Sequence, residues 1–261
     1  MKGRNMAKII AIANQKGGVG KTTTAVNLSA AIAQAGKKVL MVDLDPQGNT
    51  TSGFGRMVNE RSSVYDAMMG RAELKNCIQN TEIKKLKLIG ADIRLAGAEV
   101  ELVSMKDREY FLKKLLGVVR EDYDFVFIDC PPSLSLLTLN ALAAADSVLV
   151  PIQCEYYALE GVTALMNTVN RVKHTFNPHL EIEGILLTML DGRTNLGLQV
   201  VDQVKKHFRK AVFATMIPRN VRLGEAPSHG EPICLYDPRS SGAIAYEALA
   251  GEVLSRNKKK K

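Results

Sequence analysis

Several residue types that mark particular kinds of binding site are scarce or absent in this chain of 261 residues. It has no tryptophan and only 5% aromatic residues, so few rings are available to stack on the bases of splayed single strands. The four cysteines are far apart and form no CxxC pair, which argues against a closely spaced zinc or iron–sulfur site and favours free thiols. No apolar run approaches the roughly 18 residues of a membrane-spanning helix, and no signal-peptide pattern precedes the first strand-like run.

The excess of positive charge, a formal net charge of +8, is concentrated at the two ends of the chain. Lys2, Arg4, Arg256 and residues 258–261 supply seven cations, so the remaining chain carries a formal net charge of only +1. A nucleic-acid surface on the folded body would therefore be a local patch. We expect an extension at residues 1–6, one domain at residues 7–255 and a basic tail at residues 256–261. A solvated end and a role at DNA or a membrane surface are alternatives for the tail.

Strand-like apolar runs alternate with helical patterns along the chain. Continuous runs such as KVLMVD and FVFID indicate strands buried on both faces. The alternation predicts a single-domain α/β fold, with a mostly parallel twisted sheet flanked by helices on both faces. Ligands of such sheets bind at the carboxyl ends of the strands. Strands are expected at residues 8–13, 38–43, 87–90, 125–129, 147–151, 182–189 and 212–217. Helices are expected at residues 22–35, after Ser62 or Ser63, and at residues 97–103, 107–119, 134–144, 159–174, 195–208 and 242–255.

A glycine-rich segment, KGGVGKTT at residues 16–23, lies between the first strand and the first helix. Glycines allow backbone N–H groups to approach a phosphate closely, and the helix N-terminus adds favourable partial charge. We expect Lys21 to reach the β- and γ-phosphates and the Thr22 hydroxyl to ligate Mg²⁺. The segment therefore predicts a P-loop nucleoside triphosphatase. Its expected nucleotide-binding residues are Lys16, Gly17, Gly18, Val19, Gly20, Lys21, Thr22 and Thr23.

Acidic residues follow two of the other predicted strands. Asp43 and Asp45 lie at the end of the second strand, in the segment DLDPQ, and simple capping of a strand end is the alternative role for them. Asp129 ends the hydrophobic run FVFID and is followed by Cys130, Pro131 and Pro132. An acid in this position after a buried strand is expected to hold Mg²⁺ directly or through water.

The glycine-rich segment departs from the usual GxxxxGK[ST] pattern, because Gln15 stands where that pattern has glycine and Lys16 adds a second lysine. The form xKGGxGK[ST] resembles the ParA/MinD family of P-loop ATPases, which implies ATP and Mg²⁺ as cofactors. The resemblance implies that Lys16 reaches across a nucleotide-sandwich dimer to the partner's phosphates. It also implies that Asp45 orients the attacking water, with a possible contact to Mg²⁺ through water, and that Asp43 supports the site. The expected catalytic residues are Lys16, Lys21 and Asp45.

Three later segments, at residues 151–161, 187–195 and 217–228, resemble the chromosomal ParA (Soj) partition proteins. The similarity runs from about residue 8 to residue 253, and no helix-turn-helix region precedes the P-loop, unlike in the larger plasmid ParA proteins. The resemblance places Pro218 and Asn220 near the adenine. It assigns Arg193 and Arg222 to non-specific DNA binding, with a solvated surface arginine as the alternative for each. Widening of this DNA-binding patch and a solvated helix face are alternatives for Lys205, Lys206, Arg209 and Lys210, and the solvated face is the favoured interpretation.

The resemblance implies a switch that partitions chromosomes or plasmids. ATP would close a homodimer, which binds double-stranded DNA without sequence preference, and a ParB-type partner would stimulate slow hydrolysis. We expect a cytoplasmic, nucleoid-associated protein without stable membrane binding.

Three other functions on this fold are alternatives. A MinD-like positioning ATPase acting on a membrane or protein cargo would need an amphipathic C-terminal helix, whereas residues 255–261 offer no apolar face. A cluster carrier or nitrogenase-type reductase would need suitably placed cysteines. For an ATP-using enzyme related to biotin or cobyrinate synthesis, the partition-type segments after residue 150 argue against the assignment.

Overall fold

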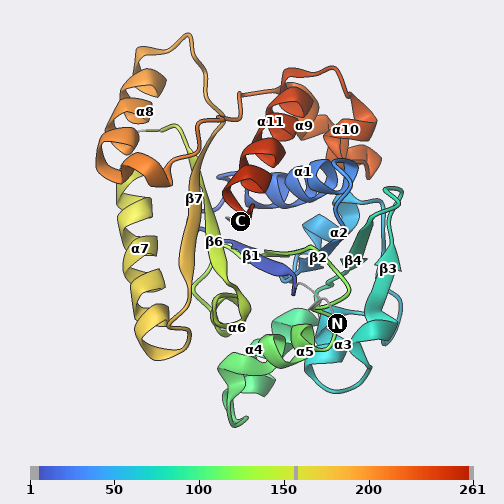
Figure 1. Cartoon of the computed structure of the whole chain (residues 1–261). Helices are drawn as coiled ribbons and strands as arrows, with labels where there is room; N and C mark the ends of the chain where they lie inside the picture. Colours follow the sequence, from blue (N-terminus) through green and yellow to red (C-terminus); the bar gives the residue numbers. More distant parts are fainter. Residues whose placement is uncertain (1–5, 156–157, 259–261) are drawn as a thin grey trace.

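A twisted seven-stranded sheet forms the centre of the molecule in the computed structural model, which describes residues 6–155 and 158–258 (Figure 1). The strand order is β3-β4-β2-β5-β1-β6-β7. All neighbouring pairs are parallel except β3 and β4, which are antiparallel. The strands are β1 (Lys8–Ile12), β2 (Val39–Asp43), β3 (Ile78–Asn80), β4 (Leu86–Ile89), β5 (Phe125–Asp129), β6 (Ser147–Gln153) and β7 (Glu181–Thr188).

Helices cover both faces of this sheet, which confirms the predicted α/β fold. The α-helices are α1 (Lys21–Gln34), α2 (Asn49–Gly53), α3 (Val64–Met68), α4 (Leu95–Val103), α5 (Phe111–Gly117), α6 (Leu136–Ala144), α7 (Ala158–Thr175), α8 (Asn195–Phe208), α9 (Val221–Glu225), α10 (Ile233–Tyr236) and α11 (Ser241–Arg256). The described residues also form the short 3₁₀ helices η1 (Leu74–Cys77), η2 (Arg108–Tyr110), η3 (Arg209–Ala211) and η4 (Ala226–His229).

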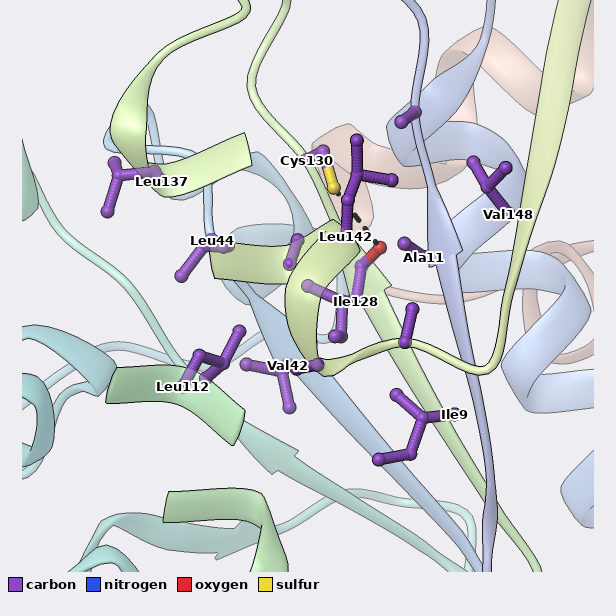
Figure 2. Packing of buried hydrophobic residues seen from close by; sticks show 14 of the residues in the cluster. Ile9, Ala11, Val42, Leu44, Leu112, Ile128, Cys130, Leu137, Leu142 and Val148 are labelled. Atoms are coloured by element: carbon purple, nitrogen blue, oxygen red, sulfur yellow. Dashed lines mark hydrogen bonds between the residues drawn. The ribbon is translucent and has the colours of Figure 1, made fainter. Parts of the chain in front are cut away.

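Alternate side chains of the central strands enter two separate cores. Ile9 and Ala11 of β1 pack with residues of α3 to α8 on one face, and Figure 2 shows them beside Val42 and Leu142. Ile10 and Ile12 point to the other face and pack with α1 and α11. Because both faces are covered, the strands contain continuous apolar runs.

One predicted strand, at residues 212–217, does not form. Phe213 N–H and Ile217 N–H bond to carbonyls of β7, but only isolated bridges form at Val212 and Pro218. Between them, the N–H groups of Ala214 and Thr215 donate to the carboxylate of Glu252 on α11. The segment is extended, but the Glu252 carboxylate accepts hydrogen bonds from N–H groups that pairing with a neighbouring strand would require.

The structure differs from the predicted elements at two other places, the β3 edge of the sheet and the helices that follow it. Residues 78–80, which lie in the part of the chain expected to be loop-rich, form the antiparallel edge strand β3. The helix expected at residues 107–119 is shorter, because η2 precedes α5 and α5 ends at Gly117.

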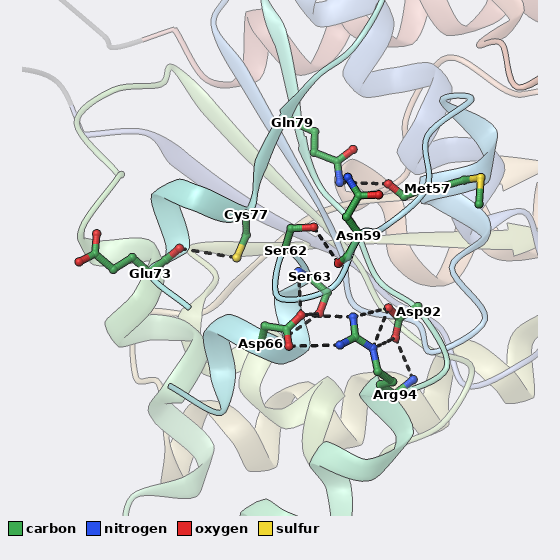
Figure 3. Close-up of polar contacts among 10 residues, drawn as sticks. All are labelled: Met57, Asn59, Ser62, Ser63, Asp66, Glu73, Cys77, Gln79, Asp92 and Arg94. Carbon is green, nitrogen blue, oxygen red and sulfur yellow. Dashed lines mark hydrogen bonds and ion pairs between the residues drawn. The ribbon is translucent and has the colours of Figure 1, made fainter. Parts of the chain in front are cut away.

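The short helix expected after Ser62 or Ser63 is α3, and a buried polar network fixes its start (Figure 3). Ser63 and Asp66 form a reciprocal capping box, which satisfies free N–H groups of the first turn. Arg94 donates to both Asp66 and Asp92, and this joins α3 to the segment that follows β4.

Candidate nucleotide-binding site

The glycine-rich segment forms a loop between β1 and α1 in which two glycines have left-handed backbone conformations. The φ angles are 73° at Gly18 and 83° at Gly20, and Gly20 caps α1. Residues with a Cβ rarely adopt such angles, so the loop depends on glycine at both positions. The loop is also tied to neighbouring strands. The Asn14 amide donates to Pro151 O while its oxygen accepts Lys16 N–H, and the Thr188 hydroxyl donates to Val19 O.

The two lysines of the loop have different environments. Lys21 is buried, and its Nζ donates to Lys16 O over 3.2 Å, so its ammonium lies against the loop. Burial lowers the pKa of Lys21, and the negative charge of Asp129 opposes this shift. The Lys16 side chain is 42% exposed, and its Nζ lies 3.4 Å from Glu155 Oε2. Lys16 therefore lies at the rim of the loop, where a second molecule can reach it.

Asp129 is fully buried at the end of β5, beside the start of α1. Its Oδ2 accepts hydrogen bonds from Thr22 Oγ1 at 2.8 Å and Thr50 Oγ1 at 2.7 Å. Its Oδ1 is buried and has no hydrogen-bond partner within the described part of the chain. Burial raises the pKa of Asp129 to about 7, with a further contribution from the negative charge of Asp43. A free carboxylate oxygen beside a threonine hydroxyl fits Mg²⁺, which prefers one or two protein ligands together with water and phosphate oxygens.

Asp43 lies next to Asp129 across the β2–β5 pair, but both of its carboxylate oxygens accept hydrogen bonds. Its Oδ2 accepts from the N–H and hydroxyl of Thr51, at 2.8 Å and 2.6 Å, and its Oδ1 accepts from Asp45 N–H. Burial raises the pKa of Asp43 to about 6. The carboxylate thus holds the segment after β2 in place. Asp45 is also buried, and its Oδ1 accepts from Gln47 N–H.

Thr50, Thr51 and Asn14 were not singled out from the sequence, although they organise the site. Apart from the bond between Asn14 and Lys16 N–H, the contacts described above join positions 8 to 137 residues apart, so no local pattern predicts them. The only signal is the polar run GNTTS that follows DPQ and forms α2.

A cleft of about 340 Å³ continues from the loop to the segment after β7. Among the residues that line it are Gly20, Thr23, Pro218 and Asn220, so the structure brings the last two beside the start of α1. Asn220 Oδ1 accepts from Leu223 N–H at the start of α9, and its Nδ2 donates to Ser241 Oγ over 2.7 Å. The cleft adjoins the phosphate loop and has mostly apolar walls, which suits a nucleotide base.

Arg193 and Arg222 lie outside this cleft lining, on exposed segments, and both are paired with acids. Arg193 donates to both carboxylate oxygens of Asp191, at 2.9 Å each, and its side chain is 90% exposed. Arg222 bonds to Glu225 at 2.8 Å and lies 3.5 Å from Asp237. A phosphate group would have to compete with these carboxylates.

The parallel sheet, the left-handed glycines and the Lys21, Thr22 and Asp129 cluster define a P-loop nucleoside triphosphatase. Residues 7–182 match the AAA domain family. The chain is 59% identical to "Sporulation initiation inhibitor protein Soj" of Bacillus subtilis, over 95% of this chain and 98% of that protein. It is 53% identical to "Chromosome-partitioning ATPase Soj" of Treponema pallidum, over 97% and 99%. The chain belongs to the ParA/Soj family of chromosome-partitioning ATPases, as its sequence motifs predicted.

A solved structure also matches closely. A Mycobacterium smegmatis protein described as cobyrinic acid a,c-diamide synthase, with ADP and magnesium bound, superposes with a TM-score of 0.86 at 39% identity, over 98% of this chain and 97% of that chain. Its description corresponds to the alternative of an ATP-using enzyme related to cobyrinate synthesis. The chain is more similar in sequence to the partition proteins, at 59% and 53% identity, than to this protein, at 39%.

Two further predictions concern the chain ends and membrane binding. Helices long and apolar enough to cross a membrane do not occur in the described residues. Residues 1–5, Tyr156, Tyr157 and residues 259–261, which belong to the predicted extension, the segment at 151–161 and the tail, lie outside the described residues.

Proposed function

We propose that this chain is a switch ATPase that partitions DNA, with ATP and Mg²⁺ as the ligands of the loop between β1 and α1. The observation that carries the proposal is the contrast between its two loop lysines. Lys21 lies folded onto its own loop, whereas Lys16 is half-exposed at the rim. A lysine in that position can reach a nucleotide held by a second copy of the chain once its ion pair with Glu155 is broken.

The contacts of the site support the proposed roles of most of its residues, and the family resemblance supports that of Asp45. The backbone of residues 16–23 would bind phosphates, Lys21 would offset their charge, and Thr22 and Asp129 would hold Mg²⁺. When bound, Mg²⁺ offsets the negative charge that phosphoryl transfer concentrates on the phosphate oxygens. Asp45 orients the attacking water, and its backbone N–H is fixed by Asp43. Pro218 and Asn220 form part of the base-binding end of the cleft.

Nucleotide-dependent dimerisation couples this site to DNA. Lys16 of each subunit contacts the nucleotide of the other, so closure requires ATP in both. The dimer joins two weak arginine surfaces, each containing Arg193 and Arg222, and this raises the avidity for non-specific duplex DNA without new contacts. A ParB-type partner accelerates the slow hydrolysis, the γ-phosphate is lost, and the dimer leaves the nucleoid.

DNA binding to a random duplex, measured with ATP, ADP or no nucleotide, tests this proposal. We expect wild-type protein to bind most tightly with ATP, and Lys16→Ala to lose both the ATP dimer and the ATP-dependent gain. Arg193→Glu with Arg222→Glu should dimerise normally but lose that gain. A matched pair, Lys84→Glu with Lys106→Glu, changes exposed lysines far from these loops in sequence and should retain it. ATP-dependent dimerisation of wild-type protein without any gain in DNA binding would exclude the partition function.

A further inference from the structure

Each arginine assigned to DNA binding is bound to a carboxylate in this structure. Asp191 accepts hydrogen bonds from the backbone N–H, Nε and Nη2 of Arg193, at 3.1, 2.9 and 2.9 Å. The Asp191 side chain is 26% exposed, whereas the Arg193 side chain is 90% exposed. One carboxylate therefore holds both the backbone and the guanidinium of an arginine that is otherwise surrounded by solvent.

Two carboxylates surround the guanidinium of Arg222. Its Nη1 donates to Glu225 Oε2 over 2.8 Å, and its Nε lies 3.5 Å from Asp237 Oδ2, so Glu225 is the closer partner. The Tyr236 hydroxyl also donates to Glu225 Oε2, and the Tyr236 ring stacks on His229 at a centroid distance of 4.8 Å. Glu225 ends α9, whereas Tyr236 ends α10. The position of the Glu225 carboxylate therefore depends on the packing of two helices.

Chance proximity of opposite charges does not fully explain these pairs. Asp202 lies on α8 three and four residues before Lys205 and Lys206, and all three side chains are exposed. None of the three has an ion pair within the described part of the chain. An exposed ion pair also contributes little to the stability of a fold. The pairs of Arg193 and Arg222 are therefore better explained by an effect on what these arginines bind.

Both acids carry their negative charge at neutral pH. Hydrogen bonds from Arg193 lower the pKa of Asp191 to about 2, and the hydrogen bond from Arg222 lowers the pKa of Glu225. A DNA phosphate can replace the carboxylate, which breaks the hydrogen bonds of the ion pair, or it can approach with the carboxylate still in place and be repelled. In both cases the acid lowers the affinity of its arginine for DNA.

We propose that Asp191 and Glu225 keep the DNA contact of a single subunit weak, so that each subunit leaves DNA once the dimer opens. Two linked surfaces bind far more tightly than one, so the ATP dimer can stay on DNA although each surface is weak. After hydrolysis each separated subunit has only its own surface, and a strong arginine contact would hold it on DNA. The two acids are thus affinity-determining residues of the switch. This inference rests on the proposed function, in which Arg193 and Arg222 contact DNA.

The test variant is Asp191→Asn with Glu225→Gln, and its affinity for a random duplex is measured in ADP and in ATP over a range of salt concentrations. Asparagine and glutamine keep a side-chain oxygen that can accept from the Arg193 N–H and the Tyr236 hydroxyl, so the change is chiefly one of charge. Because exposed ion pairs contribute little to stability, the melting temperature should stay close to that of wild-type.

The matched control, Glu60→Gln with Asp202→Asn, measures the general effect of removing negative charge. Both control side chains are exposed and have no ion pair in the part of the chain that the structure describes, and Asp202 lies on α8, which begins two residues after Arg193. In ADP, we expect the test variant to bind at least about tenfold more tightly than the control. Its slope of log K against log salt should become steeper by up to about 0.9 for each arginine that gains a phosphate contact.

Equal affinity of the test variant and the control in ADP would overturn the inference, because the general effect of charge would then be sufficient. Weaker binding by the test variant would also overturn it, since the carboxylates would then orient the arginines for DNA instead of competing with it. If wild-type protein shows no ATP-dependent gain in DNA binding, the proposed function fails and this inference fails with it. If that gain is present and is lost in Arg193→Glu with Arg222→Glu, but the test variant equals the control, only this inference fails.

Discussion

The carboxylates at the strand ends and the arginines on the loops are the two charged regions tied to the proposed function, and they differ in burial. Asp43 and Asp129 are 0% exposed and are surrounded by threonine hydroxyls and backbone N–H groups. The Arg193 and Arg222 side chains are 90% and 55% exposed. A change in the first region therefore alters both the fold and the chemistry, whereas a change in the second should alter only association with a partner.

The largest effect on activity is expected from Asp129→Asn. This substitution preserves the shape of the side chain but removes the negative charge proposed to bind Mg²⁺. Steady-state hydrolysis should fall by at least about 100-fold, the usual effect of removing one preorganised group that stabilises charge in the transition state. The apparent affinity for Mg²⁺ should fall with it. Hydrolysis within a few-fold of wild-type would show that Asp129 is not a magnesium ligand.

The same variant should change how stability depends on pH. Burial raises the pKa of Asp129 to about 7 and that of Asp43 to about 6, from an ordinary value of 3.8. The folded protein keeps these protons over a range in which the unfolded chain has released them, so this contribution to stability is present below about pH 4 and is lost as pH rises through 6 to 7. Melting curves of nucleotide-free wild-type protein and Asp129→Asn, compared at pH 5 and pH 8, should show a smaller loss in the variant. Identical pH profiles would contradict the assignment of a raised pKa to this carboxyl group.

Thr51→Val tests the hydrogen bonds that hold Asp43 in place rather than the charge of Asp43. The variant removes a hydroxyl that donates to Asp43 and accepts from Ala91 N–H. Because both partners are buried, the free energy of unfolding should fall by about 1–3 kcal/mol. Denaturant unfolding measures this, and Thr51→Ser, which keeps the hydroxyl, should recover most of the loss.

The smallest effect on folding is expected from Arg193→Gln with Arg222→Gln. Exposed ion pairs contribute little to stability, so the melting temperature should stay close to that of wild-type. DNA binding in ATP should nevertheless weaken, and its salt dependence should become shallower. A large drop in melting temperature would mean that these arginines stabilise the fold, which would remove the contrast between the two regions.

The sequence alone determined the features that depend on local chemistry and on unbroken hydrophobic runs. The segment KGGVGKTT requires left-handed glycines at a strand-to-helix turn, and Gly18 and Gly20 adopt them. Runs such as FVFID need burial on both faces, which a parallel sheet covered by helices provides. The family followed from the second loop lysine, and the comparisons confirm that family.

Tertiary structure alone decided which polar groups meet. Thr50 reaches Asp129 because the ends of β2 and β5 are neighbours in the sheet, a pairing that no local pattern encodes. Glu252 of α11 takes the N–H groups of Ala214 and Thr215, so an extended segment with strand-like residues does not join the sheet. Arg256, the last residue of α11, bonds to Val212 after η3 and to Glu183 of β7, across 44 and 73 residues. Hydrogen bonds of such span form only after the core has placed their elements together, because their donors and acceptors have no preference for one another in the unfolded chain.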